Sequence, residues 1–164
     1  MKISIISFTK TGQQLAEKIR ESMRWEDAVM LYTKCSRMGK KTVPAADNGS
    51  DIIAVKNSGI NAGDIIVVHE SISAWAGEQM AAHHALVFIG ACGIAVRAIA
   101  PWITDKLHDS PVLVMDEQGQ YVIPLLSGHV GGANELAARL AGELGAIPVI
   151  TTATDGRGLF AVDS

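Results

Sequence analysis

The stretch Tyr121-Val-Ile-Pro-Leu-Leu-Ser-Gly-His-Val-Gly-Gly-Ala-Asn134 decides how this chain folds. An apolar run breaks into a glycine-rich loop, which leads directly into a segment with leucine and alanine at spacings of three and four residues. This order predicts a strand, a loop and a helix. Gly145 is expected to end the helix, because glycine readily adopts the left-handed conformation found at helix C-termini.

A second stretch repeats this pattern. Residues 85–89 form a continuous apolar run, and a Gly-Ala-Cys-Gly sequence separates it from a segment with helical spacing. Open α/β sheets bind ligands at the carboxyl ends of their strands, so Gly90 and Gly93 are candidate ligand-binding positions. The sequence therefore predicts that residues 90–93 and 127–132 line one common cleft.

The remaining apolar segments complete an α/β pattern. Short apolar runs typical of strands alternate with amphipathic segments typical of helices. Residues 112–115 and 121–125 flank a turn that contains Gly119, which predicts an antiparallel hairpin. Thr11 and Gln14 have the spacing of a capping box at the first helix. We therefore expect a three-layer α/β/α fold with a mostly parallel, mixed central sheet.

Length and composition indicate one soluble domain. A chain of 164 residues can bury about two-thirds of its unfolded surface. A net charge of −3 argues against nucleic acid as a partner, and the lack of an apolar run of about 18 residues argues against a membrane segment. Cys35 and Cys92 have neither disulfide nor zinc-ligand spacing, so a metal site is not expected. These features predict a cytoplasmic protein.

Polar side chains in the loop of the first stretch are the candidate catalytic groups. His129 can act as a general base, because histidine gains and loses a proton near neutral pH; the alternative is that its imidazole braces the loop. Ser127 can act as a nucleophile, although it lacks the G-x-S-x-G pattern. Asn134 can bind a ligand at the start of the helix. The loop glycines can let a ligand approach the backbone closely: Gly128, Gly131 and Gly132.

Two basic side chains are candidates for binding an anionic ligand. Arg97 lies one helical turn after the second glycine turn, and Lys106 lies in the polar segment that follows Pro101. Arginine can pair with a carboxylate through two hydrogen bonds. The alternative for each is a surface ion pair, for Lys106 with Asp105 or Asp109.

Other groups have a structural interpretation beside a functional one. The basic segment 34–41 can attract an anion or form a solvated loop. The His-His pair at 83–84 can bind a metal or interact with a helix dipole. Cys92 can bind cobalt, act as a nucleophile, or be a small buried side chain. The Asp-Glu pair at 116–117 can supply two carboxylates or form a turn.

Several motifs are long and contiguous. They are Gly90-Ala-Cys-Gly-Ile-Ala-Val-Arg-Ala-Ile-Ala-Pro101, Asp105-Lys106, Val114-Met-Asp-Glu-Gln-Gly119, Ile123-Pro-Leu-Leu-Ser-Gly-His-Val-Gly-Gly-Ala-Asn134 and Thr151-Thr-Ala-Thr-Asp155, with Ser7-Phe-Thr-Lys-Thr-Gly12 and Trp75-Ala-Gly-Glu78. Together they resemble the N-terminal domain of the cobalamin-biosynthesis protein CbiG.

The resemblance implies a cobalt-precorrin-5A hydrolase, which opens the δ-lactone of a cobalt corrinoid precursor and releases acetaldehyde in anaerobic cobalamin biosynthesis. It implies a small-molecule cobalt-corrinoid as substrate and no separate cofactor, because the substrate carries the cobalt. The acetate and propionate arms of a corrinoid are anionic, so Arg97 and Lys106 are expected to bind them.

The resemblance also implies a domain organisation. We expect one domain over residues 1–164, with 1–84 and 85–155 as subregions, and without the C-terminal domain into which the family usually continues. We therefore expect the isolated chain to turn over poorly, if at all. The alternative function is a non-catalytic corrinoid-binding or partner-docking module. A phosphate-binding protein ranks low, because the glycine loops lack the G-x-x-x-x-G-K-[ST] and G-x-G-x-x-G patterns.

Overall fold

The computed structural model describes residues 1–23, 28–35 and 64–153. Its strands form one seven-stranded sheet in the order β3-β2-β1-β4-β5-β6-β7. The strands are β1 (Lys2–Ser7), β2 (Ala28–Thr33), β3 (Ile65–Val67), β4 (Ala85–Ile89), β5 (Val112–Met115), β6 (Tyr121–Leu126) and β7 (Ile147–Pro148). The helices are α1 (Lys10–Met23), α3 (Ile72–Ala81), α4 (Cys92–Ile99), the short 3-10 helix η1 (Ala100–Trp102) and α5 (Ala133–Leu144).

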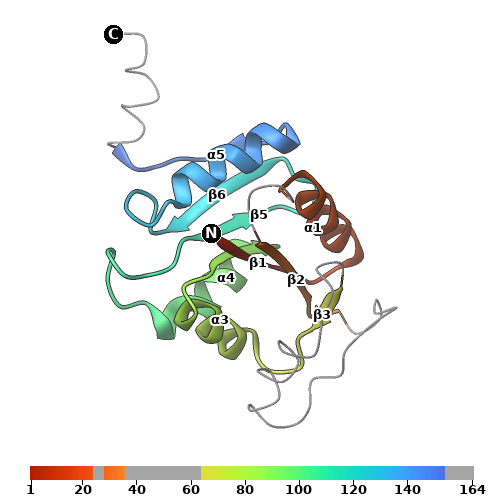
Figure 1. Ribbon diagram of the computed structural model, residues 1–164, viewed down its shortest axis with the longest axis horizontal. Coiled ribbons are helices and arrows are strands. Elements are labelled where there is room, and N and C mark those ends of the chain that lie inside the picture. Colours follow the sequence, from red (N-terminus) through yellow and green to blue (C-terminus); the bar gives the residue numbers. More distant parts are fainter. Residues whose placement is uncertain (24–27, 36–63, 154–164) are drawn as a thin grey trace.

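The sheet is mixed, as the sequence predicts. Strands β3, β2, β1, β4 and β5 are parallel to their neighbours. Strand β6 returns antiparallel to β5, and β7 runs parallel to β6. Helices α1 and α5 lie on one side of the strands, and α3 and α4 lie on the other (Figure 1). The expected three-layer α/β/α fold is confirmed.

Each face of the sheet has its own apolar core. Side chains alternate between the two faces of a strand, so Ile5 and Val87 pack under α1 and α5, whereas Ile6 and Phe88 pack under α3 and α4. All five residues of β4 are buried. Strands covered on both faces are expected to be continuously apolar, which explains the unbroken run at residues 85–89.

Trp75 anchors α3 to the sheet. Its indole is almost completely buried and makes edge-to-face contacts with Tyr32 and Phe88, with ring centroids 5.3 and 5.7 Å apart. Such pairs contribute about 0.5–1.5 kcal/mol each beyond the burial of apolar area.

One predicted helix end is confirmed at Gly145, and one is wrong at Thr11. Ser71 caps α3 by accepting the N–H of Ala74 at 3.0 Å, and Gly145 ends α5 in the left-handed conformation, with φ 67°. The first helix instead begins at Lys10, and the side chain of Thr9 accepts the N–H of Gly12 at 3.1 Å. The predicted capping box at Thr11 is therefore wrong, because the cap lies two residues earlier.

The hairpin between β5 and β6 reverses the chain direction at this side of the sheet. A register irregularity follows Val112, and β6 extends to Leu126. Pro124, which has no N–H to donate, lies in this irregular part of the pairing.

Helix α1, at 14 residues, is well short of the roughly 20 needed to cross a bilayer, and none of the described helices is long and apolar enough to do so.

Candidate functional site

The two glycine loops lie at opposite ends of the sheet, so the predicted common cleft is wrong. Strands β4 and β5 are parallel, whereas β6 returns antiparallel and places Leu126 beside Val112, the first residue of β5. Residues 127–132 therefore lie where β4 and β5 begin, which we call the amino end. Residues 90–93 lie where these strands finish, the carboxyl end. The length of β4 separates the two ends by about 16 Å, at about 3.3 Å per residue.

Phe8 covers Gly90 at the carboxyl end. A Cβ built on Gly90 would lie 3.2 Å from Cδ2 of the Phe8 ring. The chain continues from β1 to β2 on one side and from β4 to β5 on the other, so the topological switch point of the sheet lies between β1 and β4. Helices α1 and α4 begin here on opposite faces, with the partial positive charge of a helix N-terminus.

Arg97 folds back toward the start of its own helix. A Cβ on Gly93 would lie 3.4 Å from both Nη atoms of Arg97, and the arginine is exposed. The guanidinium adds positive charge to the beginning of α4, where Ala91 provides no side-chain cap. Gly90, Gly93 and Arg97 are therefore brought together, in a setting that favours an anion.

A contact at the carboxyl end, which the sequence analysis missed, joins Thr9 to the β5–β6 turn. The Thr9 hydroxyl donates to Oε1 of Glu117 at 2.7 Å. Asp116 forms the turn as expected, because its Oδ1 accepts the N–H groups of Gln120 and Tyr121 at 2.9 and 2.7 Å. The two residues are 108 positions apart, so no local sequence pattern predicts this bond. The only sequence signal was the motif Ser7–Gly12, which contains Thr9.

At the amino end, the loop after β6 closes back onto the start of α5. Ser127 has φ 58°, in the left-handed region, and its Oγ donates to the carbonyl oxygen of Asp109 at 2.7 Å. The N–H of Ala133 donates to the carbonyl of Ser127 at 3.1 Å. The N–H of Asn134 donates to the carbonyl of Gly128 at 3.0 Å. The loop conformation is thus determined by its own hydrogen bonds.

Close contacts within this loop explain its glycines. A Cβ on Gly131 would lie 2.4 Å from Cβ of Ser127, and a Cβ on Gly128 would lie 2.8 Å from Oδ1 of Asn134. Gly132 has φ 87°, which L side chains rarely adopt. Close packing at Gly128 and Gly131 and the backbone conformation at Gly132 therefore account for the three glycines, and their contact with a ligand stays a prediction.

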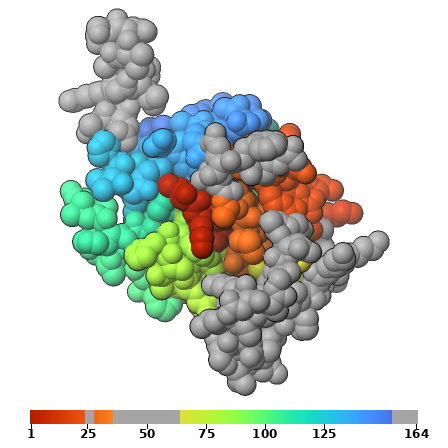
Figure 2. Space-filling model, in the orientation of Figure 1, coloured from red at the N-terminus to blue at the C-terminus, as the bar shows by residue number. Residues whose placement is uncertain are grey.

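His129 lies on an exposed part of this loop, beside Val130, which is 63% exposed. Met1 approaches the same loop, since its Cε lies 3.6 Å from the position of a Cβ on Gly132. The first residues of the chain lie at the surface between the blue segment of α5 and the yellow-green segment of α3 (Figure 2). An ionisable imidazole thus lies near exposed apolar side chains at the amino end.

Asn134 connects the loop with the segment after β7. Its side chain is buried, and its Nδ2 donates to Oγ1 of Thr152 at 2.9 Å. The amide therefore holds the beginning of α5 in place. A direct role in binding substrate stays a prediction.

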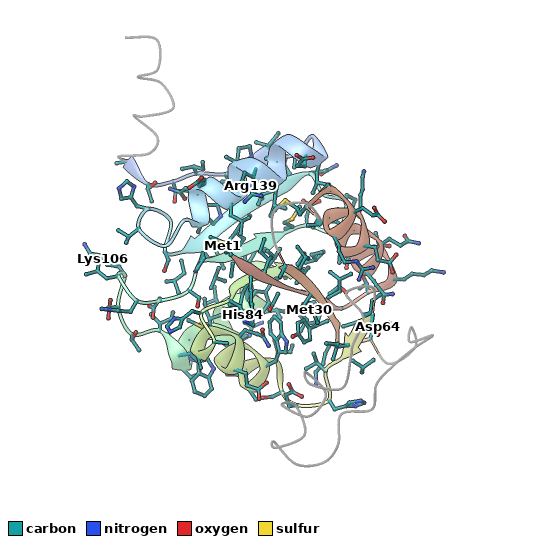
Figure 3. All side chains as sticks on the ribbon, viewed as in Figure 1. Met1, Met30, Asp64, His84, Lys106 and Arg139 are labelled. Carbon is teal, nitrogen blue, oxygen red and sulfur yellow. The ribbon has the colours of Figure 1, made fainter. Side chains whose placement is uncertain are left out.

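The loop that carries Lys106 is tied to the Ser127 loop. The carbonyl oxygen of Asp109 accepts a hydrogen bond from the Ser127 hydroxyl. The buried carboxylate of Asp109 accepts hydrogen bonds from the N–H and the hydroxyl of Thr104 at 2.9 and 2.8 Å. Lys106 lies at the outer edge of the molecule (Figure 3). The structure therefore places Lys106, Ser127 and His129 at the same end of the sheet. The linking role of Asp109 was not foreseen.

The acidic residues considered as partners of Lys106 bind other groups. The Asp105 carboxylate contacts Nδ1 of His108 at 2.8 Å and accepts the N–H of Leu107 at 2.8 Å. The hydrogen bond from His108 and, to a smaller extent, that from Leu107 hold the pKa of Asp105 below its usual value of 3.8. The Asp109 carboxylate binds Thr104, as described above.

The candidate metal ligands have structural roles. Across residues 1–23, 28–35 and 64–153, no three His, Cys, Asp or Glu side chains are grouped so that they could hold a metal. Nδ1 of His84 lies 2.9 Å from Oε1 of Gln79 and 3.3 Å from Oγ of Ser4, so His84 joins a polar cluster under α3. Cys92 is half-buried and packs against the core under α3 and α4, as a small apolar side chain does.

Among the basic residues of segment 34–41, Lys34 alone belongs to the part that the structure describes. Its Nζ donates to the carbonyl oxygens of Glu70 and His69, the latter at 3.4 Å. Lys34 therefore ties the end of β2 to the loop before α3. Arg37, Lys40 and Lys41 lie outside the described residues.

Comparison with curated proteins finds sequence similarity to one group of enzymes. Over 89 residues the chain is 57% identical to the cobalt-precorrin-5A hydrolase of Salmonella typhimurium, which covers 54% of this chain and 25% of that protein. Over 78 residues it is 50% identical to the cobalt-precorrin-5A hydrolase of Priestia megaterium, which covers 48% of this chain and 21% of that protein. The chain thus matches about a quarter or less of these relatives' length.

A solved structure has a similar fold. A cobalamin biosynthesis protein G homolog from Sulfolobus solfataricus superposes with a TM-score of 0.56 at 25% sequence identity, covering 92% of this chain and 36% of that one. The family model described as cobalamin synthesis G N-terminal matches residues 74–155, which is half of the 164-residue chain and includes both glycine loops. The chain therefore belongs to the cobalamin synthesis G N-terminal family.

Proposed function

We propose that this chain is the N-terminal part of a cobalt-precorrin-5A hydrolase, and that the amino end of its sheet carries the reacting group. The observation that supports the activity most strongly is the 57% identity over 89 residues to the Salmonella typhimurium enzyme of that name. The family match over residues 74–155 includes His129 and the loop around it.

His129 is the general base of the proposed reaction. It accepts a proton from a water molecule as the water oxygen bonds to the lactone carbonyl carbon. The bond from that carbon to the ring oxygen then breaks, and the proton passes to the ring oxygen. A positioned base contributes about 10²–10⁴ in rate. Exposure of His129 at the loop surface gives water and substrate access to the imidazole.

The surroundings of His129 suit a large, partly apolar ligand with anionic arms. Val130, Met1 and Leu107 are 63%, 56% and 60% exposed, and they offer apolar contacts for the macrocycle. Lys106, on the loop tied to Ser127, offers a positive charge for one carboxylate arm.

Ser127 shapes this site in our proposal and does not attack the substrate. Its hydroxyl donates a hydrogen bond to the carbonyl oxygen of Asp109, so the hydroxyl proton points into the protein. Its left-handed backbone and the close approach of Gly131 set the course of the loop that carries His129.

The group of Gly90, Gly93 and Arg97 does not share this site. About 16 Å of strand separates the two ends, so a corrinoid bound at His129 would have to pass around the sheet to meet Arg97. We therefore propose that any contact between Arg97 and a carboxylate lies outside the His129 site and affects ligand binding independently of it.

A second candidate function is a non-catalytic corrinoid-binding module. The observation that favours it is the small share of the relatives that the chain spans, 25% and 21%. Anaerobic incubation of the purified chain with cobalt-precorrin-5A, with assays for both acetaldehyde and bound corrinoid, separates the two. Acetaldehyde release supports the hydrolase, and binding without release supports the module. The absence of both acetaldehyde release and corrinoid binding would refute both functions for the isolated chain.

A further inference from the structure

One face of the sheet carries apolar side chains that no described helix covers. We call it the β6–β7 face, formed by Tyr121, Ile123, Leu125 and Ile147. Val122 belongs to the core under α5, and side chains alternate along a strand, so its neighbours Tyr121 and Ile123 point to the opposite side. Ile147 is the register partner of Tyr121 and therefore lies on that same side.

Exposure shows that this face is open in the described part of the chain. Tyr121 is 45% exposed and Ile147 is 58% exposed, and Ile123 and Leu125 are only half-buried at the margin of the core under α3 and α4. Helix α5 lies over β6 on the other side, and α3 and α4 lie toward β1 (Figure 1). None of these four side chains is charged.

These properties are typical of a protein interface. Contiguous exposed apolar side chains mark contact surfaces more often than isolated ones do. A tyrosine adds a large apolar body with a hydroxyl that can bond to a partner, and tyrosine is enriched at the centres of interfaces. Strand β7 is an edge strand of two residues, so it gives a partner a short apolar border and little backbone to pair with.

We propose that the β6–β7 face is the docking surface for the C-terminal part of the polypeptide that the longer relatives carry. The matched region is 25%, 21% and 36% of the three longer proteins, and the matching family model describes an N-terminal region. Most of each relative therefore lies outside the similarity. A domain that follows β7 along the chain can reach this face directly, because Ile147 is itself part of it. The partner should present an apolar surface with an acceptor for the Tyr121 hydroxyl.

The test compares the same substitutions in two proteins. Tyr121→Glu with Ile147→Glu is made in the 164-residue chain and at the aligned positions of the full-length Salmonella typhimurium relative. Val96→Glu, on a similarly exposed apolar residue of α4, is the matched control. Thermal unfolding, hydrogen exchange in β6 and β7, and oligomeric state are measured for each.

In the 164-residue chain the paired substitution should move the Tm by no more than about 2 °C, because exposed sites tolerate charge. In the full-length relative it should lower the Tm by about 5 °C or more, or split the transition, and raise exchange in β6 and β7 about tenfold. The control should have little effect in either protein. Equal small effects in both proteins would show that the face is uncovered, and a dimer of the 164-residue chain abolished by the paired substitution would assign the face to a second copy. Either result overturns the proposal.

Discussion

The indole ring of Trp102 lies directly on Gly77 of α3. A Cβ built on Gly77 would lie 2.5, 2.7 and 2.9 Å from Cε2, Cζ2 and Cδ2 of the ring. Nε1 of Trp102 donates to the carbonyl oxygen of Ser73 at 2.8 Å, one turn earlier in the same helix. The glycine therefore lets η1 dock on α3, and it explains why a helix interior contains this residue.

Replacing Gly77 by alanine should destabilise the fold by about 1–3 kcal/mol, the usual cost of forcing extra atoms into a packed contact. The new methyl group must displace the Trp102 ring and break its bond to Ser73. Thermal or denaturant unfolding measures the change.

Gly142 in α5 provides the matched control, because no atom lies within 4 Å of a Cβ at that position. Gly142→Ala should stabilise the protein by about 0.5–1 kcal/mol through helix propensity alone. In a Trp102→Ala background, Gly77→Ala should lose most of its cost. A Gly77→Ala variant as stable as Gly142→Ala would show that the ring does not oppose a side chain there.

Substitution of Ser127 should separate its hydrogen bond from its backbone conformation. Ser127→Ala loses the bond to Asp109 and should cost about 1 kcal/mol. Ser127→Gly loses the same bond but relieves the left-handed conformation, which costs other residues about 1–2 kcal/mol, so its stability should stay near that of the parent. In a form of the protein that turns over, Ser127→Gly should keep turnover within about tenfold. Loss of about 10⁴ or more in both variants, with stability retained, would instead assign Ser127 as a nucleophile.

His129 and Arg97 should have different kinetic signatures, because they lie at opposite ends of the sheet. As a base that acts only while the lactone opens, His129→Ala should lower kcat by about 10²–10⁴ with little change in corrinoid binding. If Arg97 contacts a carboxylate equally in the ground and transition states, Arg97→Ala should raise KM and leave kcat nearly unchanged. Steady-state kinetics on a full-length form measures both. An unchanged kcat together with a lower Tm would make His129 a structural brace of the loop.

Tyr32 should make stability depend on alkaline pH. Burial, opposed in part by hydrogen bonding to Gln79, raises the pKa of Tyr32 above 10.0. The unfolded chain therefore loses this proton at a lower pH than the folded chain does. The stabilising contribution is complete below pH 10 and is lost as the pH rises through the higher folded value.

The chain contains only two tyrosines, so Tyr121→Phe isolates the signal of Tyr32. The tyrosinate absorbance of this variant should have its midpoint above pH 10.0 in the folded protein and near the ordinary value of about 10 in denaturant. A folded midpoint at or below 10 would contradict the effect of burial.

Local sequence patterns predicted the layers and several of the element boundaries. Apolar runs such as 85–89 and the amphipathic spacing of 133–144 depend only on which residues neighbour one another along the chain, and so does the cap at Gly145. The antiparallel hairpin was predictable for the same reason, since Gly119 adopts φ 68° in its turn. The family resemblance was also carried by contiguous motifs, and the family match over residues 74–155 confirms it.

Which of these motifs share an end of the sheet depends on how distant strands pair. The hairpin reverses the direction of β6, so two strand-loop-helix units of similar pattern place Gly90 and Ser127 at opposite ends. The hairpin itself was predictable, but the parallel pairing of β4 with β5, which places Gly90 at the other end, joins segments that are distant in sequence and has no local pattern. The contacts of Thr9 with Glu117, of Ser127 with Asp109 and of Trp102 with Gly77 depend on the same long-range pairing and helix packing, which position residues that lie far apart in sequence within bonding distance.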